Sequence, residues 1–224
     1  MTQLQTEIHQ LKNDILEMFR MVSIQMIKAE QSLTKFDPDM AHEVVAKEKR
    51  VNAYELKLDR DCEDIFALYN PMAVDLRFVL AVLKINTNLE RLGDIADGIA
   101  RLVIDQNEPY SQDLLERSQV LVMFDAVKIM LSDAAQAFEN EDSRLARSIF
   151  KRDETLNEIN GDANHIISEL VKSYPDSLFQ CFNLISMIRK LERAGDQIKN
   201  IAEEIIFYIE AKVLKHKPGK RNGV

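Results

Sequence analysis

The sequence is poor in residues that interrupt helices. Its 224 residues include only six glycines and five prolines, and tryptophan is missing. It also lacks the sustained alternation of apolar and polar residues that is typical of strands. What remains is 46% hydrophobic and 29% charged, and Ala, Leu, Glu, Lys and Ile are frequent. This composition predicts an all-helical protein with long helices.

The charge balance and the cysteine content argue against several classes of protein. A formal net charge of −8 disfavours a broad nucleic-acid interface. Basic residues gather in residues 213–224, which we predict to be a flexible tail. Cys62 and Cys181 form no metal-type pair, and two thiols without a secretion signal fit a reducing compartment. Because no apolar run is long enough to span a membrane, we expect a cytoplasmic protein that associates with membrane complexes only peripherally, without direct insertion.

Motifs of common enzymes are missing too. No P-loop, dinucleotide-binding fingerprint or Ser- or Cys-centred nucleophile motif occurs. A ferritin-like di-iron centre would require Glu-x-x-His on two helices, and no such tetrapeptide is present. We therefore predict no catalytic residues, and we predict that the protein is not an enzyme.

Helix-breaking segments divide the chain into six runs with helical periodicity. Each break contains a proline or a capping Asp, Asn or Ser, at which a helix ends or begins. The breaks are FDPD at 36–39, YNP at 69–71, QNEPYS at 106–111, ENED at 139–142 and SYPDS at 173–177. We predict six helices of about 30 residues, each roughly 45 Å long.

The two halves of the chain match each other. At an offset of 105 residues, Asn52 aligns with Asn157. Further on the offset becomes 102, so that NLERLGD at 88–94 aligns with KLERAGD at 190–196. Short loops make consecutive helices antiparallel. The predicted fold is all-α, a tandem repeat of two antiparallel three-helix bundles at residues 1–107 and 108–212, followed by the basic tail.

The third and sixth predicted helices each carry an apolar stripe with the 4-3-4-3-4 spacing of a coiled coil. We predict that both stripes are core. Their members are Ile85, Leu89, Leu92, Ala96, Ile99 and Val103 in the first repeat, and Met187, Leu191, Ala194, Ile198, Ile201 and Ile205 in the second.

A row of acidic and amide side chains lies away from each stripe. The rows are Glu90, Asp94 and Asp97 in the first repeat, and Glu192, Asp196, Asn200 and Glu203 in the second. Carboxylates one helical turn apart have Cβ atoms about 5–6 Å apart, so they can share a cation and repel each other without one. Each row therefore either faces water or binds a counter-ion. Oxygen ligands favour magnesium, calcium, manganese or iron over structural zinc.

A glycine interrupts each row, at Gly93 and at Gly195. A glycine inside a helix is about 1 kcal/mol less favourable than alanine, so another group is expected to approach the backbone closely there. Recurrence of the same pattern in both repeats favours a metal or partner site. The alternative is a solvated face on which Arg91 and Arg193 are the local partners.

These segments resemble the PhoU family, the accessory and regulatory proteins of bacterial phosphate-specific transport. The resemblance extends over roughly residues 5–212, and its main features are NLERLGDIADGIA, KLERAGDQIKNIAEE and the segment NPMAVDLR at 70–77. It implies two three-helix bundles, a homodimer and surface metal clusters, with iron as the first candidate and zinc or magnesium as alternatives. By the same resemblance, the ligands would be Glu90 and Asp94 in one site and Glu192, Asp196 and Asn200 in the other. Asp75 matches a further characteristic position of the family.

The resemblance also implies a function. Family members repress phosphate uptake and phosphate-starvation signalling by contact with the ATPase subunit of the phosphate ABC transporter and with a membrane sensor histidine kinase. The sequence departs from the family at Gly98, which aligns with Asn200, although the neighbouring Asp97 could compensate. Ile95 and Gln197 stand where many members have His. The alternative function is a carboxylate-bridged metalloenzyme or metal store on a helical bundle.

Overall fold

The computed structural model describes residues 2–212, and the predicted basic tail, residues 213–224, lies outside them. All regular structure in the described part is helical, which confirms the predicted all-α class. The helices are α1 (Gln3–Lys35), α2 (Pro38–Tyr69), α3 (Val74–Ile104), α4 (Gln112–Arg117), α5 (Val120–Glu139), α6 (Ser143–Ser173), the 3₁₀ turn η1 (Pro175–Ser177) and α7 (Leu178–Glu210).

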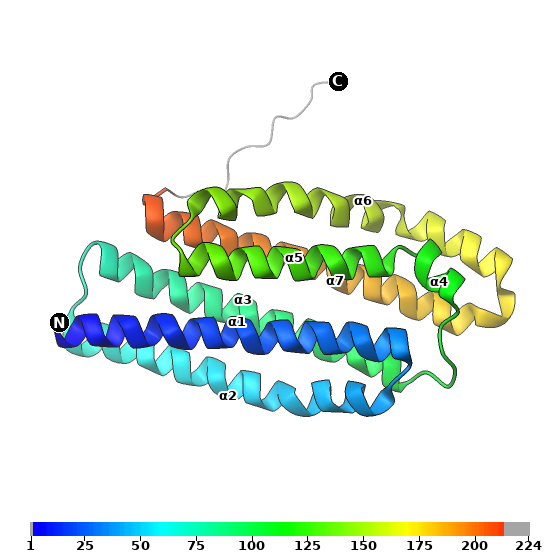
Figure 1. Ribbon diagram of the computed structural model, residues 1–224, viewed down its shortest axis with the longest axis horizontal. Coiled ribbons are helices and arrows are strands. Elements are labelled where there is room, and N and C mark those ends of the chain that lie inside the picture. The colour runs from blue at the N-terminus through cyan, green and yellow to red at the C-terminus, as the bar shows by residue number, and fades with distance from the viewer. Residues whose placement is uncertain (1, 213–224) are drawn as a thin grey trace, which may run out of the picture.

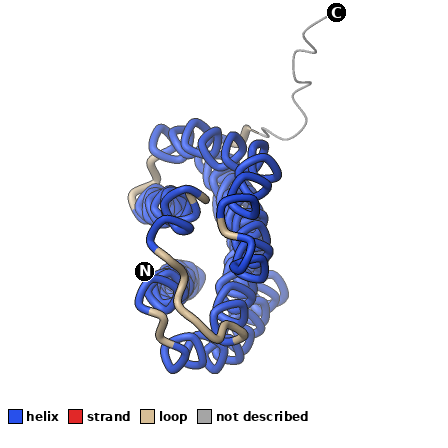
Figure 2. The backbone as a smooth tube through the Cα atoms, turned by 90° about the vertical axis from the view of Figure 1, so that its right-hand side faces the viewer, coloured by secondary structure: helices blue, strands red, loops and turns tan. Residues whose placement is uncertain are grey.

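The long helices form two bundles of three that lie side by side (Figure 1). One bundle contains α1, α2 and α3, and the other contains α5, α6 and α7. The bundles join where α3 packs against α7 and α1 packs against α5, so α2 and α6 lie at the outer ends of the molecule (Figures 1 and 2). This arrangement confirms the tandem repeat of two antiparallel three-helix bundles.

The apolar stripes of α3 and α7 form the centre of the core. All twelve predicted stripe residues have no exposed surface. At one end of the interface between the bundles, the rings of Phe19, Phe78, Phe138 and Tyr208 contact one another, with centroid distances of 5.7–6.1 Å. Burial of these large side chains from both halves holds the two bundles together as one unit.

The helix boundaries follow from local capping chemistry. The carboxylate of Asp37 accepts a hydrogen bond from the backbone N–H of Met40 at the start of α2, and Pro38 occupies the first turn. The carboxylate of Asp142 accepts from the N–H groups of Arg144 and Leu145 at the start of α6. The breaks predicted at FDPD and ENED are thus confirmed, and the break at YNP is confirmed by the end of α2 at Tyr69.

The start of the second repeat differs from the prediction of six helices of about 30 residues. The run after QNEPYS is divided into the six-residue helix α4 and the 20-residue helix α5. The division occurs at Gln119, whose φ of 59° is left-handed, and Ser118 stabilises the turn by donating its hydroxyl hydrogen bond to the Leu115 carbonyl. Apolar periodicity runs through this break and hides it, because α4 also buries Leu114 and Leu115. In the described part of the chain, no helix is long and apolar enough to cross a membrane.

Candidate metal centre

Three carboxylates from two helices of the first repeat converge on one point. Glu90 and Asp94 lie one turn apart on α3, and Glu48 reaches them from α2. Each offers a carboxylate oxygen, and the three oxygens lie within 4.8 Å of one another. The acidic row of α3 therefore lies at the seam between α2 and α3, where Glu48 and Glu90 are half-buried and Asp94 is exposed. We call Glu48, Glu90 and Asp94 the α2–α3 carboxylate cluster.

The electrostatics of this cluster show crowded negative charge. Burial and the neighbouring Asp94 carboxylate raise the pKa of Glu48 to about 7. Burial, followed by repulsion from Asp94, also raises the pKa of Glu90. Both carboxylate oxygens of Glu48 are buried without a hydrogen-bond partner. A cation placed between these oxygens would remove the repulsion and supply the missing partner.

A buried amide borders the same cluster. Gln25 of α1 is only 2% exposed, and neither polar atom of its side chain has a hydrogen bond of acceptable geometry. Oε1 of Gln25 and Oε2 of Glu48 both approach the backbone of α3 at Gly93, so the amide lies beside the cluster. Asn52, one turn beyond Glu48 on α2, also has a buried side-chain oxygen without a partner. Buried polar atoms are normally satisfied, so their accumulation around one point indicates a site for a ligand or water.

The space behind the cluster comes from Gly93. A Cβ atom at this position would lie 3.1 Å from Oε1 of Gln25, 3.2 Å from Cγ1 of Val51 and 3.5 Å from Oε2 of Glu48. The missing side chain thus lets α1 and α2 bring polar groups close to the backbone of α3. This close approach is what the glycine in the sequence motif predicted.

The corresponding place in the second repeat contains a lysine. Nζ of Lys199 lies 2.7 Å from a carboxylate oxygen of Asp153 on α6 and 2.7 Å from one of Asp196 on α7. The side chain of Asp153 is only 4% exposed, and its Oδ2 also accepts a hydrogen bond from Asn157 at 2.7 Å. Although burial disfavours the ammonium form, the two carboxylates raise the pKa of Lys199. We call Asp153, Asp196 and Lys199 the α6–α7 lysine cluster.

Gly195 provides the same kind of space as Gly93, but with less room. A Cβ atom at Gly195 would lie 2.4 Å from Cδ1 of Leu156 and 2.7 Å from Oδ1 of Asp153. Glu192 lies one turn before Asp196, and burial together with the charges of Asp196 and Asp153 raises its pKa. The α6–α7 lysine cluster is therefore built on the same scaffold as the α2–α3 carboxylate cluster, but it contains an ammonium group between its carboxylates.

Comparison with known proteins identifies this scaffold. The sequence model described as "PhoU domain" matches residues 15–103 and again residues 120–205. The chain belongs to the PhoU family. It is 29% identical over 218 residues to the phosphate-specific transport system accessory protein PhoU homolog of Aquifex aeolicus, an alignment that covers 97% of each chain. It is 30% identical over 219 residues to the homolog of Pseudomonas putida, covering 98% of this chain and 85% of that one.

Solved PhoU structures show the same fold. The crystal structure of PhoU from Pseudomonas aeruginosa superposes with a TM-score of 0.86 at 28% identity, covering 94% of this chain and all of that one. The phosphate transport system regulatory protein PhoU of Streptococcus pneumoniae superposes with a TM-score of 0.83 at 26% identity, covering 96% and 100% of the two chains. The resemblance drawn from the doubled ERxGD motif is confirmed at the level of family and fold.

Within this PhoU fold, some predicted ligands do not reach a carboxylate cluster. Asp97 forms a two-point ion pair with Arg101, at 2.7 Å and 3.1 Å. The amide of Asn200 donates instead to Oδ1 of Asn88 across the contact between α3 and α7, at 3.4 Å. Asp75 lies in the first turn of α3, 15 residues before Glu90, which corresponds to about 22 Å along the helix.

The departure from the family pattern at Gly98 is explained by the contact between α3 and α7. A Cβ atom at Gly98 would lie 2.6 Å from Nζ of Lys190 on α7. Since α3 and α7 pair across the two repeats, Gly98 makes room for this lysine, just as Asn200 meets Asn88 at the equivalent crossing. The difference between Gly98 and Asn200 thus reflects packing between the repeats.

The ERxGD motif did not identify Glu48 and Asp153, which come from the second long helix of each repeat. Both were visible at the offset of 105, because Glu48 aligns with Asp153 four residues before the matched pair Asn52 and Asn157. An acidic residue at the same place in both repeats is the signal that identifies them. The spacing of ERxGD points only to residues on its own helix.

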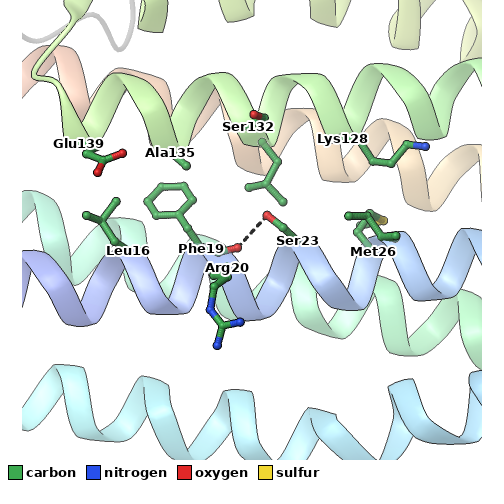
Figure 3. Close-up of a pocket in the computed structure, with 11 residues that line it drawn as sticks. Leu16, Phe19, Arg20, Ser23, Met26, Lys128, Ser132, Ala135 and Glu139 are labelled. Carbon is green, nitrogen blue, oxygen red and sulfur yellow. Dashed lines mark hydrogen bonds between the residues drawn. The ribbon is translucent and has the colours of Figure 1, made fainter.

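A separate apolar groove lies between α1 and α5, apart from either cluster. Figure 3 shows Leu16 and Phe19 of α1 pointing toward α5, where Ala135 lies opposite. The hydroxyl of Ser23 is used within α1, since it donates to the Phe19 carbonyl at 2.8 Å. This groove follows the junction of the two repeats, and Arg20, Lys128 and Glu139 are among the residues that line it.

Proposed function

We propose that this chain is a non-catalytic regulator of phosphate uptake and of phosphate-starvation signalling. The single observation that supports this role most strongly is the double PhoU-domain match at nearly full-length alignment with phosphate-transport accessory proteins. The chain would act as an adaptor that contacts the ATPase subunit of the phosphate ABC transporter and a membrane sensor histidine kinase. Homodimer formation belongs to the same proposal.

We further propose that the α2–α3 carboxylate cluster binds a metal ion. Glu48, Glu90 and Asp94 would hold it, and their hard oxygen ligands fit iron, manganese or magnesium. When bound, the ion would supply positive charge and join α2 to α3. The support comes from the uncompensated carboxylates and from the orphaned polar atoms of Glu48, Gln25 and Asn52.

Phosphate uptake in a strain that lacks the gene tests the regulatory role. We expect uptake and starvation-gene expression to stay high at high phosphate in the deletion strain, and complementation with the wild-type chain to restore repression. Unchanged uptake and an unchanged starvation response after deletion would contradict the role.

Elemental analysis of protein purified without a chelating tag tests the metal site. We expect the wild type to contain metal and the Glu90→Gln, Asp94→Asn double variant to lose it. Asp75→Asn is the matched control, because Asp75 lies on the same helix outside the cluster. Equal metal content in the wild type and the double variant would refute these ligands.

A further inference from the structure

The two clusters occupy equivalent places but differ in the charge of the side chain one turn beyond the central aspartate. At the offsets of 105 and 102, Glu48 aligns with Asp153 and Asp94 aligns with Asp196. The same alignment places Asp97 opposite Lys199. The first repeat therefore has an acidic side chain one turn beyond its central aspartate, and the second repeat has an ammonium group there.

We infer that the ammonium group of Lys199 takes the place of a metal ion in the second repeat, so that the chain has a single metal centre, in the first. The part of this inference that concerns the first repeat rests on the proposed metal site. The part that concerns the second repeat rests on the geometry of Lys199 alone.

The contacts of Lys199 explain how it excludes a cation. Its Nζ lies between the carboxylates of Asp153 and Asp196, at 2.7 Å from each, which is the position a bridging ion would need. A metal ion could enter only by displacing the ammonium and leaving it nearby as a like charge. Asp153, with 4% of its side chain exposed, depends on this partner because a buried carboxylate without compensation is strongly unfavourable.

Lys199 also links two helices, as the proposed metal ion would do in the first repeat. It starts on α7 and reaches Asp153 on α6, so it links the second and third long helices of its repeat. A metal held by Glu48, Glu90 and Asp94 would link α2 to α3 in the same way. The second repeat thus has a permanent link, whereas the link in the first repeat would depend on metal.

Metal binding by variants with a disabled first site tests the inference. In the Glu90→Gln, Asp94→Asn background, we expect no bound Mn²⁺ and no change of Tm on adding Mn²⁺. Adding Lys199→Ala to this background should create binding of about one Mn²⁺ per chain and raise Tm by several degrees with the ion present. Lys190→Ala is the matched control, since Lys190 lies on α7 against Gly98 and should create no site.

The result separates failure of the inference from failure of the proposed metal site. Mn²⁺ binding in the background that retains Lys199, or no gain when Lys199 is replaced, would overturn the inference even if the wild type binds metal. An absence of metal from the wild type would refute only the proposed first site.

A reciprocal variant covers the case in which Lys199→Ala does not fold. Asp97→Lys places an ammonium beside the α2–α3 carboxylate cluster at the position equivalent to Lys199. It should abolish the metal of a metal-binding wild type, whereas Asp97→Asn should retain it. Full retention of metal by Asp97→Lys would overturn the idea that a lysine at this position excludes the ion.

Discussion

The α2–α3 carboxylate cluster and the α6–α7 lysine cluster share a scaffold and differ in how their charge is balanced. In both, an acidic side chain from the middle helix of the repeat reaches a glycine and an aspartate on the last helix. In the first repeat, three carboxylates meet and the pKa of Glu48 rises to about 7 through burial and its neighbour Asp94. In the second, Lys199 joins two carboxylates at 2.7 Å. The two repeats share this geometry, and the proposed metal ion of the first cluster would balance the charge that Lys199 balances in the second.

The largest effect is expected from removing the cation of the second repeat. Lys199→Met should lower the free energy of unfolding by about 3 kcal/mol, because it leaves the buried carboxylate of Asp153 without its cationic partner. Glu48→Gln should instead raise the free energy of unfolding of the metal-free protein, since it removes repulsion within the first cluster. Urea unfolding in the presence of a chelator measures both, and equal destabilisation by the two variants would contradict the difference in charge balance.

The glycines should differ in tolerance of a side chain. Gly195→Ala should lower the free energy of unfolding by about 2 kcal/mol, because its Cβ would overlap Leu156 and Asp153, both of which are buried. In Gly93→Ala, the new Cβ atom would lie 3.1 Å or more from its neighbours. The gain in helix propensity of about 1 kcal/mol should offset most of the strain. Thermal unfolding compares the two variants, and a larger loss of stability for Gly93→Ala than for Gly195→Ala would contradict this prediction.

Glu48 of the first repeat should contribute to the pH dependence of stability. Since the folded-state pKa of Glu48 is raised to about 7, the folded state binds its proton more tightly than the unfolded chain. Stability of metal-free protein should therefore fall as pH rises from about 4.5 to about 7, by at most about 1.4 kcal/mol per pH unit. Glu48→Gln should flatten this slope, and an unchanged slope in that variant would assign the effect to other groups.

The smallest effects are expected at predicted ligands that lie outside the clusters. Asn200→Ala should lower stability by less than about 1 kcal/mol, through loss of its hydrogen bond to Asn88. Metal content should be unchanged, because the amide lies in the contact between α3 and α7. Elemental analysis beside a melting curve checks both, and loss of metal from Asn200→Ala would return this residue to the ligand set.

The sequence was sufficient to predict the helical class, the repeat and the core stripes, because periodicity and breaker residues are local signals. It was also sufficient to place Glu90, Asp94 and Asp196 at the two sites, through the doubled ERxGD motif. The contributions of α2 and α6 were not anticipated, since contact between helices depends on tertiary packing that motif spacing does not encode. Lys199 was overlooked for a related reason: a lysine within an acidic helix is ordinarily a surface residue, and only its contact with Asp153 shows what it does.

The occupancy of the two sites can be observed directly by anomalous diffraction from crystals of the wild-type protein grown with Mn²⁺. We predict one anomalous peak per chain among the oxygens of Glu48, Glu90 and Asp94, and lysine density without a peak between Asp153 and Asp196. A peak in the second repeat, with Lys199 turned away from both aspartates, would contradict the assignment of the lysine as its resident cation.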